Sequence, residues 1–106
     1  GEVSKAVTVH HEELEALVAD IASRLPGAFG AVNVQVFVSD DRLSVIEVNP
    51  RFGGGFPLTW QAGARFPEWL LAEVTGGKPE VEEWSDGVVM LRYDDAVFAK
   101  ADEVGL

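Results

Sequence analysis

The sequence predicts an α+β fold that combines an antiparallel sheet with two main helices. Between residues 11 and 25, apolar side chains recur with the spacing of an amphipathic helix. Between residues 31 and 48, apolar and polar side chains alternate, as they do along two strands joined by a turn. A second helical pattern follows a stretch rich in glycine and proline. With 106 residues, the chain has the size of a single domain.

The first half of the chain is expected to form a strand, a helix and a hairpin. Residues 3–9 predict the first strand. The helix is expected over residues 11–25, with acidic residues in its first turn and Pro26-Gly27 at its end. Residues 31–38 place four valines on one face, and residues 43–48 return after a polar turn. The apolar positions of the helix are Leu14, Leu17, Val18, Ile21, Ala22 and Leu25.

The second half is expected to form a loop, two helices and a small hairpin. Residues 51–57 predict an irregular loop because they hold three consecutive glycines and a proline. Thr59 is expected to cap a short helix, and Pro67 to lie in the first turn of the next one. Gly76-Gly77 is expected to end that helix. The hairpin is expected from residues 88–92 and 96–99, with its turn at Asp94-Asp95.

Composition excludes several classes of function. With 47% hydrophobic and 25% charged residues the chain is globular in character, and the absence of cysteine excludes disulfides and thiol catalysis. The 18 acidic and 8 basic residues give a net charge of −10 without a basic cluster, so we expect no nucleic-acid partner. No apolar run approaches the roughly 20 residues of a membrane helix. We therefore expect no membrane association, and the absence of cysteine favours a cytoplasmic location.

Two oxygen-bearing side chains, Glu47 and Asn49, interrupt a strand that is otherwise apolar. Residues two apart in a strand point to the same face, so both side chains leave the sheet together. Gln35 interrupts the valine pattern of the preceding strand in the same way. Carboxylate and amide oxygens suit a hard cation such as Mg²⁺, which keeps waters or substrate phosphates as further ligands. The sequence predicts a magnesium site of these three residues, with a solvated face as the alternative for Glu47 alone.

This site depends on the register of the hairpin. Gln35 and Glu47 can share an ion only if they lie on one face, which requires paired residue numbers to add to an even value. Pairing Gln35 with Glu47 places Val36 opposite Ile46 and closes the hairpin with a three-residue loop at 40–42. A two- or four-residue loop would place Gln35 and Glu47 on opposite faces unless a bulge intervened.

Arg51 and the glycines that follow it are predicted to bind an anion. Arg51 follows the rigid Pro50, and its planar guanidinium can hold two oxygens of one anionic group. Three consecutive glycines, residues 53–55, indicate special backbone angles and allow the backbone to approach an anion closely. A surface salt bridge for Arg51 and a plain turn for the glycines are the alternatives.

The histidines and tryptophans give less specific signals. His10 and His11 are adjacent and would point apart on an extended segment, so we expect a role at the start of the helix rather than a metal pair. Trp60, Trp69 and Trp84 would form a stacking surface only if they lay together, and packing is the expected role. No Ser-His-Asp arrangement is predicted, because nothing pairs a serine with the two histidines.

The run Glu47-Val48-Asn49-Pro50-Arg51-Phe52-Gly53-Gly54-Gly55 resembles the E-x-N-P-R element of the ATP-grasp ligases. Gly1-Glu2-Val3, Asn33-Val34-Gln35 and Ala62-Gly63-Ala64 are similar to the C-terminal subdomain of that superfamily, so the resemblance covers most of residues 1–99. The closest likeness is to the carbamoyl-phosphate-synthase-like ATP-grasp proteins, which use a glutamine where many relatives have an acid. The resemblance implies the C-terminal lobe of an ATP-grasp fold.

The resemblance also implies roles for the polar residues. In that family the Glu and Asn of the element bind the Mg²⁺ ions that bridge the phosphates of ATP, with Mn²⁺ as a possible substitute. Glu47 and Asn49 would take these roles, and Gln35 would match the first metal ligand on the preceding strand. Arg51 would be the catalytic residue that steadies the transferred phosphate or an acyl-phosphate intermediate.

Two apolar residues are implied to contact the adenine. Phe37 lies two residues after Gln35 in the sequence, and Ile46 directly precedes Glu47. Strict alternation places Ile46 on the face opposite Glu47, where a role in the core is an equally good interpretation. Gln35, Phe37, Ile46 and Glu47 would together form the ATP-binding set.

The implied function is that of half an ATP-dependent carboxylate–amine or carboxylate–thiol ligase that works through an acyl phosphate. Nothing here resembles the family's phosphate-gripping lysine and flap, so we expect residues 1–106 to be a single C-terminal subdomain, inactive alone. ATP and a carboxylate would bind with the help of an N-terminal portion, and the exposed lobe surface would favour a homo-oligomer. Two rival functions are a non-catalytic interaction or regulatory module that kept the scaffold, and an acidic cation-binding domain without nucleotide.

Overall fold

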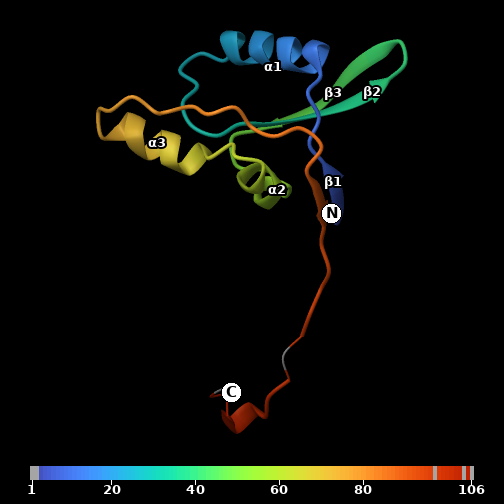
Figure 1. Ribbon diagram of the computed structural model, residues 1–106, viewed down its shortest axis with the longest axis vertical. Coiled ribbons are helices and arrows are strands. Elements are labelled where there is room, and N and C mark those ends of the chain that lie inside the picture. Colours follow the sequence, from blue (N-terminus) through green and yellow to red (C-terminus); the bar gives the residue numbers. More distant parts are fainter. Residues whose placement is uncertain (1–2, 97, 104, 106) are drawn as a thin grey trace.

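The strands of the protein form two separate two-stranded antiparallel sheets (Figure 1). The computed structural model describes residues 3–96, 98–103 and 105, so Gly1 and Glu2 of the resemblance lie outside the described residues. The predicted α+β class is confirmed, with the strands divided between a β1–β4 sheet and a β2–β3 sheet. The elements are β1 (Lys5–Val7), α1 (Glu12–Arg24), β2 (Asn33–Ser39), β3 (Arg42–Asn49), α2 (Phe56–Gln61), α3 (Phe66–Val74), β4 (Val89–Leu91) and a 3-10 helix (Ala101–Glu103).

The β2–β3 hairpin contains a β-bulge in its middle. Gln35 pairs with Glu47, as predicted, whereas the next residue, Val36, pairs with Val45. Ile46 is therefore an extra residue in β3 without a partner in β2. The predicted even register is confirmed at the Glu47 end of the hairpin. The predicted pairing of Val36 with Ile46 is wrong, because the bulge shifts the rest of the ladder by one residue.

The bulge resolves a conflict in the apolar pattern of β3. Leu43 and Val45 are two residues apart, but Val48 follows Val45 by three, so strict alternation would send Val48 to the opposite face. The extra residue Ile46 restores the alternation. The three side chains now lie opposite valines of β2 on one face, in the pairs Val38–Leu43, Val36–Val45 and Val34–Val48. One unpaired ladder position thus keeps six apolar side chains together.

The loop that closes this hairpin has two residues, Asp40-Asp41, instead of the three predicted. Ser39 pairs with Arg42, and Ser39 Oγ donates to the Arg42 carbonyl at 3.1 Å. A three-residue loop commonly needs a left-handed residue at its last position, which would be Arg42 in the predicted loop. Only glycines among the described residues have a positive φ, so Arg42 does not adopt that conformation. The loop is one residue shorter than predicted and the bulge adds one residue to β3. The two changes cancel, and Gln35 still faces Glu47.

β4 pairs with β1, so the predicted hairpin of residues 88–92 and 96–99 is wrong. Ala96 and residues 98–99 belong to no strand, and Val97 lies outside the described residues. Thr8 favours the long-range pairing, because its Oγ1 accepts from the Val88 amide at 2.9 Å and its amide donates to the Val88 carbonyl at 2.9 Å. A local pattern of apolar residues cannot select between a neighbouring and a distant partner strand.

The ends of the two longer helices follow the predicted signals. His11 caps α1, with its Nδ1 accepting a hydrogen bond from the Leu14 amide at 3.3 Å. Pro67 lies in the first turn of α3. Past the end of α3, Gly76 adopts a φ of 80°, and the amides of Gly76 and Gly77 bond back to carbonyls of the last turn. This is a Schellman ending, and the predicted roles of His11, Pro67 and Gly76-Gly77 are confirmed.

The short helix α2 starts earlier than predicted. It begins at Phe56, so Thr59 lies inside the helix instead of capping it, and the end of the predicted 51–57 loop is helical. Gly55 occupies the cap position without a side-chain bond. Pro57 fits the first turn because the amides there need no partner within the helix. The proline that suggested a loop is therefore compatible with a helix start.

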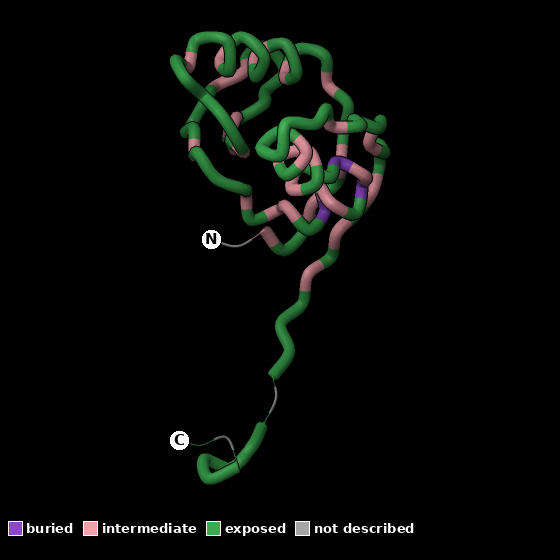
Figure 2. The backbone as a smooth tube through the Cα atoms, turned by 90° about the vertical axis from the view of Figure 1, so that its left-hand side faces the viewer, coloured by how far each residue is buried: buried purple, intermediate pink, exposed green. Residues whose placement is uncertain are grey.

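The protein has a small core and a large exposed surface. Only Leu58, Ala62 and Ala64 are buried among the described apolar residues. The accessible surface is 8592 Å², compared with about 5,800 Å² for a compact protein of this mass. Figure 2 shows exposed residues along most of the backbone, including the extended segment that runs away from the molecule after β4. No helix in the described part of the chain has the length and apolarity needed to cross a bilayer.

A polar cluster fastens the segment before β4 to the segment before α1. The His10 ring stacks on Trp84 with 3.7 Å between ring centroids, and the His10 amide donates to Asp86 Oδ1 at 3.0 Å. His10 Nδ1 donates to Glu15 Oε1 at 3.1 Å. The hydrogen bond to Glu15 is the largest cause that raises the pKa of His10 above its ordinary 6.5, with smaller contributions from the Trp84 backbone and Asp86.

Replacing Glu15 with Gln is expected to lower the pKa of His10 and to remove a pH-dependent part of the stability. Because the folded-state pKa is raised, the stabilisation is complete below the unfolded-state value of 6.5 and disappears as the pH rises through the folded-state value. NMR titration of the His10 ring and thermal unfolding across this range measure both effects. Glu13→Gln, an exposed acid on the same helix, is the matched control. An unchanged His10 titration in Glu15→Gln would contradict the assignment.

Candidate functional site

Four polar side chains, Asn33, Gln35, Glu47 and Asn49, share one face of the β2–β3 hairpin. They form two adjacent cross-strand pairs, Asn33 with Asn49 and Gln35 with Glu47. Asn49 Nδ2 donates to Glu47 Oε1 at 2.9 Å, so these two side chains are in direct contact. The prediction that Glu47 and Asn49 leave the same face is confirmed. We call these four residues the polar quartet.

The polar quartet offers one carboxylate and three amide oxygens. Gln35 and Glu47 are exposed, whereas Asn33 and Asn49 are half-buried at the end of the hairpin. Oxygen donors of this kind suit Mg²⁺ or Mn²⁺. Among the described residues, no three His, Cys, Asp or Glu side chains gather closely enough to hold a metal ion. A divalent ion on the polar quartet would therefore keep a net positive charge and would favour an anionic ligand.

Asn33 is the residue of the polar quartet that the predicted metal set omits. A β-carbon built on Gly53 would lie 2.9 Å from Asn33 Oδ1, so any other residue at this position would have to displace the amide. The cross-strand pair of Asn33 and Asn49 follows from the predicted even register. That register was the sequence signal for Asn33, since it places an amide opposite a predicted metal ligand.

The glycines of the loop at residues 52–55, which we call the glycine loop, allow close packing and do not adopt unusual backbone angles. Gly53, Gly54 and Gly55 all lack a positive φ, so the predicted special angles are wrong. Gly53 passes over Asn33, and a β-carbon on Gly54 would meet Val3 at 3.8 Å. The loop thus lies between the β2–β3 hairpin and the segment that leads into β1.

Arg51 lies between Asn49 and the glycine loop. Its amide donates to the Asn49 carbonyl at 2.8 Å, which closes a tight turn around Pro50. Its Nη1 donates to the Phe52 carbonyl at 2.9 Å. In the described part of the chain Arg51 forms no ion pair with a carboxylate. The surface salt bridge considered as an alternative is absent there, and the remaining guanidinium N–H groups are directed to no acidic side chain.

Phe37 and Ile46 are both exposed, with relative exposures of 71% and 50%. Phe37 pairs with Ser44 and lies on the face of Gln35, two residues further along β2. Ile46 is the extra residue of the bulge, so the alternation that suggested a core position does not apply to it. The exposure of both residues is compatible with the predicted adenine contacts, which stay predictions.

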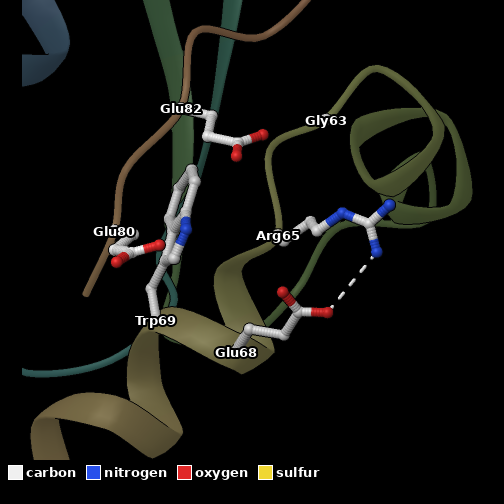
Figure 3. A pocket seen from close by; sticks show the side chains of 6 residues that line it. All are labelled: Gly63, Arg65, Glu68, Trp69, Glu80 and Glu82. Atoms are coloured by element: carbon white, nitrogen blue, oxygen red, sulfur yellow. Dashed lines mark hydrogen bonds and ion pairs between the residues drawn. The ribbon is translucent and has the colours of Figure 1, made fainter.

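The tryptophans do not form a shared stacking surface. The Arg65 guanidinium lies over the Trp60 ring, 4.8 Å from the ring centroid, and Trp84 stacks on His10. Trp69 lines a separate hollow of about 340 Å³ near the start of α3 (Figure 3). The other residues of this hollow are Gly63, Arg65, Glu68, Glu80 and Glu82, and none of them belongs to the predicted site.

Comparison with known proteins identifies one matching family. The model of a family described as "ATP-grasp in the biosynthetic pathway with Ter operon" matches residues 1–96. These residues include the polar quartet, Arg51 and the glycine loop. No curated protein matches the chain.

Replacing Gly53 with Ala is expected to displace the Asn33 amide. The added methyl group would lie closer to Asn33 Oδ1 than nonbonded contact allows, and rotation of the side chain costs about 1 kcal/mol or less. The Asn33 side-chain NH₂ resonances should therefore shift, with little change in unfolding temperature. Gly55→Ala is the control, since nothing lies within 4 Å of its β-carbon. Equal Asn33 shifts in both variants would rule out the contact.

Proposed function

The chain belongs to the ATP-grasp family, and we propose that it forms the Mg·ATP-binding part of an ATP-dependent carboxylate–amine or carboxylate–thiol ligase. Its α+β arrangement of helices and antiparallel strands is consistent with the C-terminal lobe of that fold. The observation that carries the proposal is the polar quartet, in which one carboxylate and three amides face the same side of a hairpin. The presence of Gln35 among them supports a place near the carbamoyl-phosphate-synthase-like ligases.

The donor set supports a metal–nucleotide complex over a cation alone. Gln35, Glu47 and Asn49 supply oxygens of the type that Mg²⁺ binds, but only Glu47 carries charge. Sites with few protein carboxylates are completed by substrate phosphates. This balance of charge favours nucleotide binding over an acidic cation-binding domain. The bound ion would supply charge stabilisation to the phosphates during transfer.

The residues of the chain would act mainly by positioning. In the proposed reaction a carboxylate oxygen attacks the γ-phosphorus of ATP, the bond to the β,γ-bridging oxygen breaks, and ADP leaves. The amine or thiol then attacks the carbonyl carbon of the acyl phosphate, and phosphate leaves with its electron pair. Arg51 follows Asn49 by two residues in the chain and forms no described ion pair with an acid, so it would hold an oxygen of the transferred phosphoryl group.

We further propose that another protein segment supplies the opposite wall of the site. The polar quartet lies on an open hairpin face, beside Phe37, which is largely exposed. The small core and the exposed apolar residues indicate a surface that another segment would cover. An N-terminal portion that also binds the carboxylate is the proposed source, and self-association through the same surface is the alternative arrangement.

Replacing Glu47 with Gln is expected to weaken Mg·ATP binding by about tenfold or more, in line with the loss of one charged interaction. The substituted side chain would keep an oxygen that accepts from Asn49, so the free energy of unfolding should change by less than about 0.5 kcal/mol. Isothermal titration of the complete protein with Mg·ATP measures the first effect, and thermal unfolding the second. Glu73→Gln, an exposed acid on α3, is the control. Unchanged affinity in Glu47→Gln would refute the assignment.

The 106-residue chain alone is expected to hydrolyse no ATP above the level of its Glu47→Ala variant. The reason is that the described residues offer one wall of a site whose chemistry needs water excluded from both sides. A coupled phosphate-release assay with excess Mg·ATP measures this. Turnover that depends on Glu47 in the chain alone would show that no second wall is required.

A further inference from the structure

The glycine loop has all of its carbonyl oxygens bonded within the protein. The Phe52 carbonyl accepts from Arg51 Nη1 at 2.9 Å, and the Gly53 carbonyl accepts from the Phe56 amide at 3.1 Å. The Gly54 carbonyl accepts from Arg92 Nη2 at 3.0 Å. The Gly55 carbonyl accepts from the amides of Leu58 and Thr59 in α2, at 3.0 and 3.4 Å. The loop therefore directs its acceptors toward the protein.

The amides of the same loop have no such partners. Between residues 52 and 55, no backbone N–H donates a hydrogen bond to any described residue. The loop also directly follows Arg51, whose guanidinium forms no described ion pair. A short segment with its carbonyls occupied and its amides available is suited to a phosphate oxygen. This segment contains no acidic residue, although the chain as a whole has a net charge of −10.

Arg92 is the only described residue from a distant part of the chain that bonds a loop carbonyl, since the other donors lie within four residues of their acceptors. Its backbone amide donates to the Ser4 carbonyl at 2.8 Å and continues the β1–β4 ladder. Its side chain crosses from this sheet to Gly54, and the residue is half-buried. Arg92 also forms no described ion pair with a carboxylate. Its guanidinium thus joins the second sheet to the loop.

We propose that Arg92 is a positioning residue for the anion-binding segment formed by Arg51 and the glycine loop. By holding the Gly54 carbonyl, Arg92 keeps the loop in the orientation that leaves its amides available beside the Arg51 guanidinium. The role in ATP binding rests on the proposed function. The hold on the loop is a separate physical property, and it is measurable in the protein without nucleotide.

The test compares Arg92→Gln with the wild-type protein in three measurements. Loss of the bond to Gly54 should raise the exchange rate of the Phe56 amide, which closes the loop on Gly53, by about tenfold. The dissociation constant of Mg·ATP should rise by a similar factor. Binding of Mn²⁺ alone, followed by paramagnetic broadening of the Asn49 and Gln35 side chains, should not change, because Arg92 contacts neither residue. A purely structural role would not separate nucleotide affinity from metal affinity in this way.

Two further variants keep the result interpretable. Arg24→Gln removes the same charge from an ion pair with Asp20 on α1, and it should leave all three measurements at wild-type values. Arg92→Lys retains one charged donor and should fall between Arg92→Gln and wild type. If Arg92→Gln does not fold, Arg92→Lys decides the proposal by the same three measurements.

Faster Phe56 exchange with weaker Mg·ATP binding in Arg92→Gln supports the proposal. Exchange equal to that of Arg24→Gln, or faster exchange with unchanged Mg·ATP affinity, overturns it. If the wild-type complete protein binds no Mg·ATP, the proposed function fails, and the exchange comparison alone then decides whether Arg92 holds the loop.

Discussion

The site depends on one extra residue in β3. Ile46 has no partner in β2, and its insertion changes which residues of β3 share a face. Without it, the two-residue loop at Asp40-Asp41 would fix an odd register throughout the hairpin and would place Gln35 opposite Ile46. With it, the apolar residues of both strands gather on one face while Gln35 meets Glu47 on the other. The free-energy cost of leaving one ladder position unpaired is offset by this separation of apolar and polar side chains.

The second sheet fixes the loop that follows the hairpin. β1 and β4 share a short ladder, which is strengthened at one end by the two-way bonding of Thr8 with Val88. At the other end Arg92 extends from this ladder to the Gly54 carbonyl. Gly53 meets Asn33 of the first sheet, so the glycine loop joins the two sheets. Arg92 is thereby linked, through the glycine loop, to a site formed by residues 33–51.

The small core has a direct consequence for function. Among the described apolar residues only Leu58, Ala62 and Ala64 are buried, so little apolar surface is removed from water within this chain. Several large apolar side chains, including Phe37 and Leu71, remain exposed. Gln35 and Glu47 of the polar quartet are exposed as well. This geometry suits a site that is completed when a second surface closes over it, and such closure would also exclude water from phosphoryl transfer.

The sequence by itself determined the features that follow from local periodicity and capping. The apolar spacing of α1, the histidine cap, the Schellman ending of α3 and the shared face of Glu47 and Asn49 are all encoded within a few residues of each other. The E-x-N-P-R element likewise indicated the family. The tertiary structure alone decided the bulge at Ile46, the pairing of β4 with β1, the contact of Asn33 with Gly53 and the bond from Arg92 to Gly54. Each of these joins segments whose local patterns are compatible with several partners. Only the competition among long-range contacts selects one of these partners. Of the four features, only the bulge left a local signal in the sequence, which is the three-residue step from Val45 to Val48.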